Sequence, residues 1–232
     1  MTKPLRLGIA GLGTVGVGVI KIIQNKLSLL EARTGKQILI SAVTAKSKTK
    51  DRGIDLSPYQ WERDPASLAN REDIDVFIEL IGGHEGAAKE AVEIAISKGK
   101  NVVTANKALL AHHGHELALK AEESGSILRF EAAVAGGIPV IKSLTEGLAG
   151  NSINRIMGVM NGTCNYILTR MESSGLSYEE VFSEANELGY LEADPNLDIG
   201  GIDAAHKLSI LSSIAFGTEI NFNGIEIDGI DK

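Results

Sequence analysis

An acid-rich segment in the last fifth of the chain carries the residues best suited to proton chemistry. Residues 189–211 read GYLEADPNLDIGGIDAAHKLSIL and bring Glu192, Asp198, Asp203 and Lys207 close together in sequence. Asp203 and Lys207 are four residues apart in an expected helix, so they share a helix face. A lysine amine beside a carboxylate can exchange a proton with a bound substrate. The spacing alone leaves this interpretation and an ordinary surface ion pair equally open.

A glycine-rich turn near the amino terminus has the spacing of a dinucleotide-binding loop. The segment LGIAGLGTVG places Gly11, Gly13 and Gly16 between an expected strand and an expected helix. The first glycine permits a tight turn, the second lets the backbone approach a pyrophosphate, and the third allows the helix to pack on the strand. The alternative is a glycine turn that binds nothing, but the flanking strand, helix and next strand favour a nucleotide.

The end of the second expected strand bears on the choice between NAD and NADP. An acidic residue at this place binds the ribose hydroxyls of NAD. After Val43 the sequence reads TAKSKTKDR instead, which supplies Lys46, Lys48, Lys50 and Arg52. These cations favour the 2′-phosphate of NADP, although NAD and a merely solvated basic loop stay open.

Apolar runs and helical patterns alternate over residues 1–135, which predicts an α/β, Rossmann-type parallel sheet with helices on both faces. This part is the expected dinucleotide-binding domain. The expected strands cover residues 5–10, 38–43, 74–81, 101–104 and 127–131, and the expected helices cover residues 14–30, 86–98 and 107–123.

A smaller α+β substrate-binding and catalytic domain is expected over residues 136–232, because the alternation stops near the glycine-containing stretch AAVAGGIP. We expect a strand over Ile153–Met160. The expected helices cover residues 139–148, 164–173, 178–188 and 202–216.

The composition limits the partners and the compartment. The net charge of −7 argues against nucleic acid or an anionic membrane as the main partner. No apolar run reaches membrane-spanning length, and the amino terminus lacks the layout of a signal peptide. A single cysteine, Cys164, suits a reducing compartment, so we expect a cytoplasmic protein.

Four segments, in order along the chain, resemble the homoserine dehydrogenase family. They are VVTANKALL, EAAVAGGIPVI, GVMNGTCNYIL and the acid-rich segment at 189–211. The resemblance covers essentially the whole chain and is more specific than the glycine loop. It implies the interconversion of L-homoserine and L-aspartate 4-semialdehyde with NAD(P), on the route to threonine, isoleucine and methionine.

The resemblance also implies roles for individual residues. Lys207 is expected to be the acid/base for the substrate hydroxyl, with Asp203 orienting the substrate and Lys107 helping the proton transfer. Glu192, Asp198 and Asp203 are the expected substrate-binding residues. The expected cofactor contacts are Gly11, Gly13, Thr14, Val15, Gly16, Lys46, Ile81, Gly82, Thr104, Lys107 and Gly189.

The stretch EAAVAGGIP resembles the monovalent-cation site of the family. The resemblance implies that Glu131 supplies a carboxylate and that Val134, Gly136 and Ile138 supply backbone carbonyls. Oxygen ligands suit a hard cation such as sodium. The alternative is that Glu131 only caps a glycine turn.

Two other functions stay open at this stage. Cys164 as a nucleophile would make the chain an acylating dehydrogenase of the aspartate semialdehyde type. A non-catalytic NADP-binding protein is the other alternative, because family members are usually longer and the second domain is expected to be incomplete. The resemblance implies a homodimer or a larger homo-oligomer once the missing segment is present.

Overall fold

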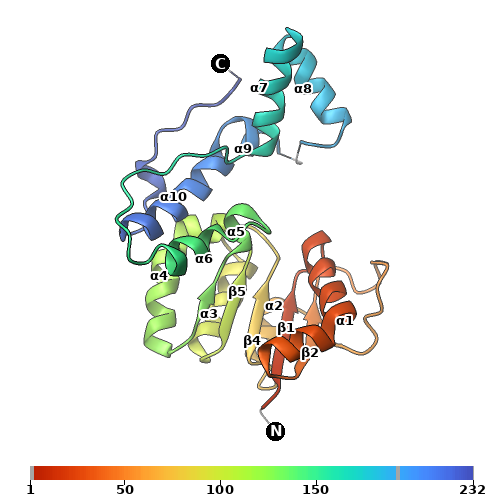
Figure 1. The fold of residues 1–232 in the computed structure, drawn as a ribbon. Coiled ribbons are helices and arrows are strands. Elements are labelled where there is room, and N and C mark those ends of the chain that lie inside the picture. Colours follow the sequence, from red (N-terminus) through yellow and green to blue (C-terminus); the bar gives the residue numbers. More distant parts are fainter. Residues whose placement is uncertain (1–2, 192–193, 232) are drawn as a thin grey trace. The chain divides into compact units, whose positions relative to one another are not determined.

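The computed structural model describes residues 3–191 and 194–231 and divides the chain into two compact units, residues 1–138 and 139–232 (Figure 1). Each unit has its own hydrophobic core. Within the described part, no helix has both the length and the apolar character that crossing a membrane requires.

A six-stranded parallel sheet forms the centre of the first unit, in the order β3-β2-β1-β4-β5-β6. The chain therefore builds outward from β1 in one direction and then restarts at β4 in the other. The strands are β1 (Leu5–Ala10), β2 (Ile38–Thr44), β3 (Gln60–Trp61), β4 (Val76–Glu79), β5 (Asn101–Thr104) and β6 (Leu128–Arg129).

Helices cover both faces of this sheet, which confirms the expected fold class (Figure 1). One face packs on α1 (Thr14–Thr34) through side chains such as Ile9 and Ile20. The other face packs on three helices, with Phe77 at the centre of the contact. Those helices are α2 (Pro65–Asn70), α3 (Ala87–Ser97) and α4 (Lys107–Ser124). Because side chains alternate along a strand, Phe77 packs on one face of the sheet, and its neighbours Val76 and Ile78 pack on the other.

Short helices make up most of the second unit. The helices α7 and α8 pack on each other through Ile167, Val181 and Ala185. A capping box formed by Ser177 and Glu180 starts α8. Along the chain, α5 is the last helix of the first unit. The bounds are α5 (Ala132–Ala135), α6 (Val140–Lys142), η1 (Ser143–Gly147), α7 (Gly162–Ser174), α8 (Tyr178–Glu187), α9 (Asn196–Ile199), α10 (Ile202–Phe216) and η2 (Phe222–Gly224).

The expected strand over Ile153–Met160 is wrong. This segment has no regular structure, and Met157 and Val159 are 79% and 77% exposed. A strand needs a neighbouring strand for its backbone hydrogen bonds, and the described residues place none beside this segment. The segment therefore has the apolar pattern of a strand but does not pair with another strand in the described part of the chain.

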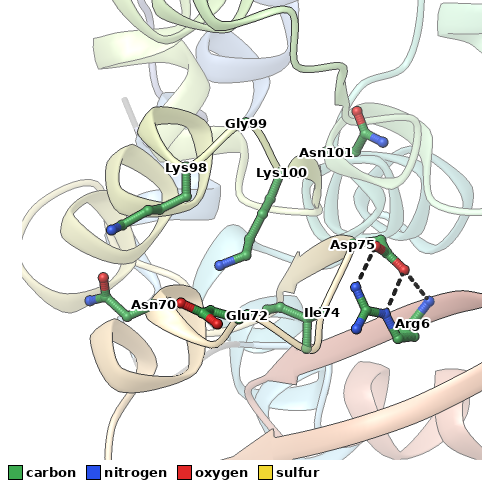
Figure 2. Close-up of a pocket in the computed structure, with 9 residues that line it drawn as sticks. All are labelled: Arg6, Asn70, Glu72, Ile74, Asp75, Lys98, Gly99, Lys100 and Asn101. Carbon is green, nitrogen blue, oxygen red and sulfur yellow. Dashed lines mark hydrogen bonds and ion pairs between the residues drawn. The ribbon is translucent and has the colours of Figure 1, made fainter.

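Ion pairs and a buried lysine close the amino-terminal edge of the sheet around a hollow of about 480 Å³ (Figure 2). Arg6 of β1 donates to Asp75, just before β4, from its guanidinium and from its backbone N–H. Lys100 donates to the Ala69 carbonyl at the end of α2, 2.6 Å away, and burial lowers the pKa of this lysine. The hollow thus lies at the edge opposite to the one where parallel α/β sheets bind ligands.

The Arg6–Asp75 pair predicts a pH-dependent contribution to stability. Hydrogen bonds from Arg6 hold the pKa of Asp75 well below its usual range. A lowered folded-state pKa stabilises the fold above the ordinary aspartate pKa, and this stabilisation is lost as pH falls through the lowered value. We expect Asp75→Asn to lower the midpoint of thermal unfolding by a few degrees at pH 7, and the difference from wild type to shrink in acid.

Lys3 provides the matched control, because its contact with Asp75 involves a largely exposed amine. Lys3→Gln should leave the midpoint nearly unchanged. Equal unfolding midpoints for Asp75→Asn and wild type at pH 7 would contradict the assigned role.

Candidate active site

The turn after β1 is shaped by close backbone packing. Gly11 has a left-handed φ of 98°, and a side chain there would overlap the carbonyl oxygen of Leu80. A side chain on Gly16 would overlap the carbonyl oxygen of Gly11. Both glycines are therefore required by the protein's own packing.

Gly13 differs from these two glycines. It is exposed, and a side chain built there would meet no protein atom within 4 Å. The helix α1 starts at the next residue, and neither a capping side chain nor an acidic residue blocks its first turn. The free amides of that turn and the open space at Gly13 fit a pyrophosphate, with the exposed Thr14 and Val15 beside it.

A basic loop follows β2, as the sequence predicted. Lys46 is exposed two residues beyond the end of the strand. Arg52 donates to the Leu12 carbonyl at 3.1 Å, and its guanidinium lies 5.6 Å from the centre of the Trp61 ring. Arg52 therefore fastens the loop to the glycine turn, whereas Lys46 faces solvent at the strand end.

The other expected cofactor contacts of this unit lie at the carboxyl ends of β4 and β5. Ile81 and Gly82 are the second and third residues after β4, and Thr104 is the last residue of β5. Lys107 is half-buried at the first position of α4, which Asn106 caps by accepting the N–H of Leu109. The carboxyl edge thus carries expected cofactor contacts from the ends of β1, β2, β4 and β5.

The expected cation loop spans α5 and the turn after it. Glu131 precedes the helix, and the side chain of Val134 is buried within it. Gly136 has a left-handed φ of 58°, which turns the chain sharply toward the exposed Ile138. Within the described ranges, no group of three or more His, Cys, Asp or Glu side chains is placed to hold a metal ion.

In the second unit, Lys207 and Asp203 form an ion pair on one face of α10. The Lys207 Nζ lies 2.6 Å from Asp203 Oδ2 and also donates to the Met160 carbonyl at 2.7 Å. The side chains are 19% and 7% exposed, so this is not an ordinary surface pair. The two hydrogen bonds fix the lysine amine in position, while part of the side chain stays exposed.

Asn161 joins this pair to a second carboxylate. Its Oδ1 accepts the backbone N–H of Cys164 as the cap of α7, which fixes the orientation of the amide. Its Nδ2 then donates to Asp198 Oδ1 at 2.7 Å and to Asp203 Oδ2 at 2.9 Å. Two buried carboxylates would repel each other, and the shared amide donor offsets part of that repulsion.

The second carboxylate has an oxygen left over. Asp198 Oδ2 is buried and has no hydrogen-bond partner among the residues that the structure describes. Glu192, expected to bind substrate, lies outside the described residues. Gly189, expected to contact the cofactor, is exposed in the turn after α8 with a φ of 74°.

Cys164 sits beside the same carboxylates, but its environment does not activate the thiol. The Sγ atom donates to the Asp198 carbonyl oxygen at 3.2 Å. Burial raises the pKa of the thiol, and the nearby charges of Asp198 and Asp203 raise it further. A nucleophilic cysteine needs a lowered pKa, so the geometry disfavours the acylating alternative.

Comparison with known proteins assigns both units to one family. A family model described as "Homoserine dehydrogenase, NAD binding domain" matches residues 11–131, and one described as "Homoserine dehydrogenase" matches residues 139–232. The chain belongs to the homoserine dehydrogenase family.

Individual homoserine dehydrogenases agree with this assignment. One from Neisseria gonorrhoeae is 49% identical over 230 residues, which cover 99% of this chain and 52% of that protein. The crystal structure of one from Thiobacillus denitrificans matches 98% of this chain and 52% of its own, with a TM-score of 0.93 and 43% identity. A hyperthermophilic archaeal homoserine dehydrogenase in complex with NADPH matches 97% of this chain and 75% of its own, with a TM-score of 0.81 and 29% identity.

This chain spans about half the length of the curated homoserine dehydrogenases that it matches. The first unit carries the NAD-binding domain of the family, and the second carries the segment with Asp203 and Lys207.

Sequence reasoning missed two polar residues of these sites, Asn161 and Glu79. Asn161 precedes a helix in NGTCN, where a capping asparagine is a recognisable signal. Its bonds to Asp198 and Asp203 span 37 and 42 residues, and no local pattern shows them. Glu79 lies in the apolar run VFIELI, which reads as a buried strand.

The contrast between Gly13 and Gly16 gives a paired prediction. Gly16→Ala should lower the free energy of unfolding by about 1–3 kcal/mol, because the new side chain overlaps backbone. Gly13→Ala should leave the free energy of unfolding nearly unchanged but weaken nicotinamide-cofactor binding about tenfold, because it fills the space left for phosphate.

Denaturant unfolding and fluorescence titration with NADPH measure these two effects on each variant. Unchanged NADPH affinity in Gly13→Ala would show that the open space at this glycine is not the phosphate site.

Proposed function

We propose that this chain catalyses the reversible NAD(P)-dependent oxidation of L-homoserine to L-aspartate 4-semialdehyde. The observation that carries the proposal is Lys207, a half-buried amine held at 2.6 Å from Asp203 in a chain whose two units both match this family. The corresponding place in metabolism is the route to threonine, isoleucine and methionine, in the cytoplasm and as a homo-oligomer.

Lys207 is the proposed acid/base. Oxidation of the alcohol breaks its O–H bond and one C4–H bond: the proton would go to the lone pair of Lys207 Nζ in its neutral form, and the hydride would leave to the nicotinamide. In the reverse direction the lysine returns the proton to the developing alkoxide. Asp203 and the Met160 carbonyl hold the amine in place in both directions of the reaction. The nicotinamide ring supplies the hydride acceptor when the cofactor is bound.

Asp198 and Asp203 are the proposed substrate-binding residues, with Glu192. The buried Asp198 Oδ2 supports this, because an unsatisfied carboxylate oxygen favours a cationic partner, such as the ammonium group of homoserine. Asn161 keeps that carboxylate turned toward Asp203. Lys107, at the carboxyl edge of the first unit, is proposed to assist the proton transfer.

NADP is the proposed cofactor, with NAD as the alternative. The exposed Lys46 supports NADP, since it follows β2 where an acidic residue would select NAD. The archaeal homoserine dehydrogenase in complex with NADPH, at 29% identity, also favours this choice. The proposed contacts are Gly11, Gly13, Thr14, Val15, Gly16, Lys46, Ile81, Gly82, Thr104, Lys107 and Gly189.

A homoserine-dependent assay of cofactor reduction tests the proposal. The wild-type chain should reduce NADP when L-homoserine is added, and should do so more efficiently than NAD. Lys207→Met should lower kcat by at least about 100-fold while NADPH binding, measured by fluorescence, stays unchanged.

Cys164→Ser is the matched control, because a hydroxyl can keep the donation to the Asp198 carbonyl. This variant should retain most of the turnover. Phosphate-dependent turnover that is lost in Cys164→Ser would support the acylating alternative. If the wild-type chain binds NADPH but reduces the cofactor no faster than Lys207→Met does, the proposal of an active enzyme is wrong. That result would favour a non-catalytic NADP-binding protein.

A sodium ion is proposed at the loop of α5, held by the Glu131 carboxylate and the carbonyls of Val134, Gly136 and Ile138. The turn at Gly136 and the all-oxygen donor set support a hard monovalent cation. Sodium chloride should then raise the midpoint of thermal unfolding relative to choline chloride at equal ionic strength. Glu131→Gln should abolish that difference, and equal midpoints of wild type in the two salts would rule the site out.

A further inference from the structure

A fully buried glutamate ends the strand β4. The side chain of Glu79 is 0% exposed. Its Oε1 accepts the backbone N–H groups of Ile81 at 2.7 Å and Gly82 at 3.1 Å, and its Oε2 accepts the Thr104 hydroxyl at 2.5 Å. Both oxygens act as acceptors of neutral donors, as an ionised carboxylate does.

The hydrogen bonds continue from Thr104 to the start of α4. Thr104 Oγ1 accepts the backbone N–H of Asn106 at 2.9 Å, and Asn106 Nδ2 donates to the Gly83 carbonyl at 2.6 Å. The segment 81–83 is therefore fastened by Glu79 at one end and by Asn106 at the other. Gly82 and Gly83 both have left-handed φ values, 86° and 82°, which glycine adopts readily.

The fastened segment adjoins the dinucleotide turn. The Leu80 N–H donates to the Ala10 carbonyl at 2.7 Å, and the Leu80 carbonyl lies against Gly11. In a doubly wound sheet the dinucleotide crosses the point where the strand order reverses, here between β1 and β4. Because the adenosine ribose is read at the end of β2, the nicotinamide half falls on the side of β4 and β5.

We propose that Glu79 is a positioning residue for the nicotinamide half of the cofactor, and that its buried charge favours the oxidised over the reduced form. The carboxylate fixes the backbone at 81–83 that the ring meets. The oxidised ring carries a positive charge and the reduced ring does not, and a buried anion acts on that charge with little screening. This inference rests on the proposed nicotinamide-dependent function.

Separate affinities for oxidised NADP and for NADPH, measured by calorimetry without substrate, test the inference. Glu79→Gln keeps the shape and removes the charge. We expect it to weaken oxidised NADP about tenfold and NADPH clearly less, so that the ratio of the two dissociation constants changes by at least about threefold. A purely structural role would weaken both forms alike.

Thr104→Val is the matched control, because it removes the hydrogen bonds of the hydroxyl to Glu79 and to the Asn106 N–H and keeps the charge of Glu79. It should weaken both forms by the same factor. An unchanged ratio in a folded Glu79→Gln overturns the inference. Should that variant not fold, Glu79→Asp decides, since it withdraws the carboxylate from the two amides. Oxidised NADP should then again lose more affinity than NADPH, because the charge moves with the carboxylate, and an equal fall of both affinities, or no fall at all, would overturn the inference.

The two proposals fail in different ways. A wild-type chain that binds neither form of the cofactor contradicts the proposed function itself. A wild-type chain that binds both, with a ratio that Glu79→Gln does not change, contradicts only the inference about Glu79.

Discussion

A backbone contact between the turns after β1 and β4 governs the nucleotide-binding edge. No side chain fits at Gly11, because the Leu80 carbonyl occupies its place. This contact sets the glycine turn directly beside the segment that Glu79 fastens, at the point where the strand order reverses. The start of α1 and the space at Gly13 follow this contact in the chain, and the ends of β4 and β5 lie beside each other through strand pairing. The proposed pyrophosphate site therefore lies beside a backbone segment that hydrogen bonds fix.

In the second unit, the positions of the polar side chains depend on the pairing of two buried carboxylates with donors. Asp198 and Asp203 are both buried, and each buried anion is costly unless it has a donor. One amide group, Asn161, serves both carboxylates because the cap of α7 fixes its orientation, and Lys207 completes the set. Asp198 Oδ2, which has no hydrogen-bond partner among the described residues, and the partly exposed Lys207 side chain are the two groups that we propose for binding a substrate. Burial, together with the neighbouring charges of Asp198 and Asp203, raises the pKa of the Cys164 thiol, which disfavours a nucleophilic role for it.

The sequence predicted what depends on local periodicity and missed what depends on distant partners. The strand at Leu5–Ala10, the helix at Ile202–Phe216 and the helix-face pairing of Asp203 with Lys207 follow from spacing, and all three are present. Ile153–Met160 has a strand pattern, but pairing needs a second segment that local sequence does not specify. Glu79 looked like part of an apolar strand, because its donors at Thr104 and in the backbone lie outside any motif.

The proposed reaction combines cofactor binding by the first unit and proton transfer at Lys207 in one hydride transfer. L-homoserine that carries deuterium at C4 tests this connection most directly. The chain is incubated with that substrate and oxidised NADP, and the mass of the reduced cofactor is measured. If the proposed hydride transfer takes place, the reduced cofactor carries the deuterium. Reduced cofactor without deuterium, or none formed at all, would contradict it.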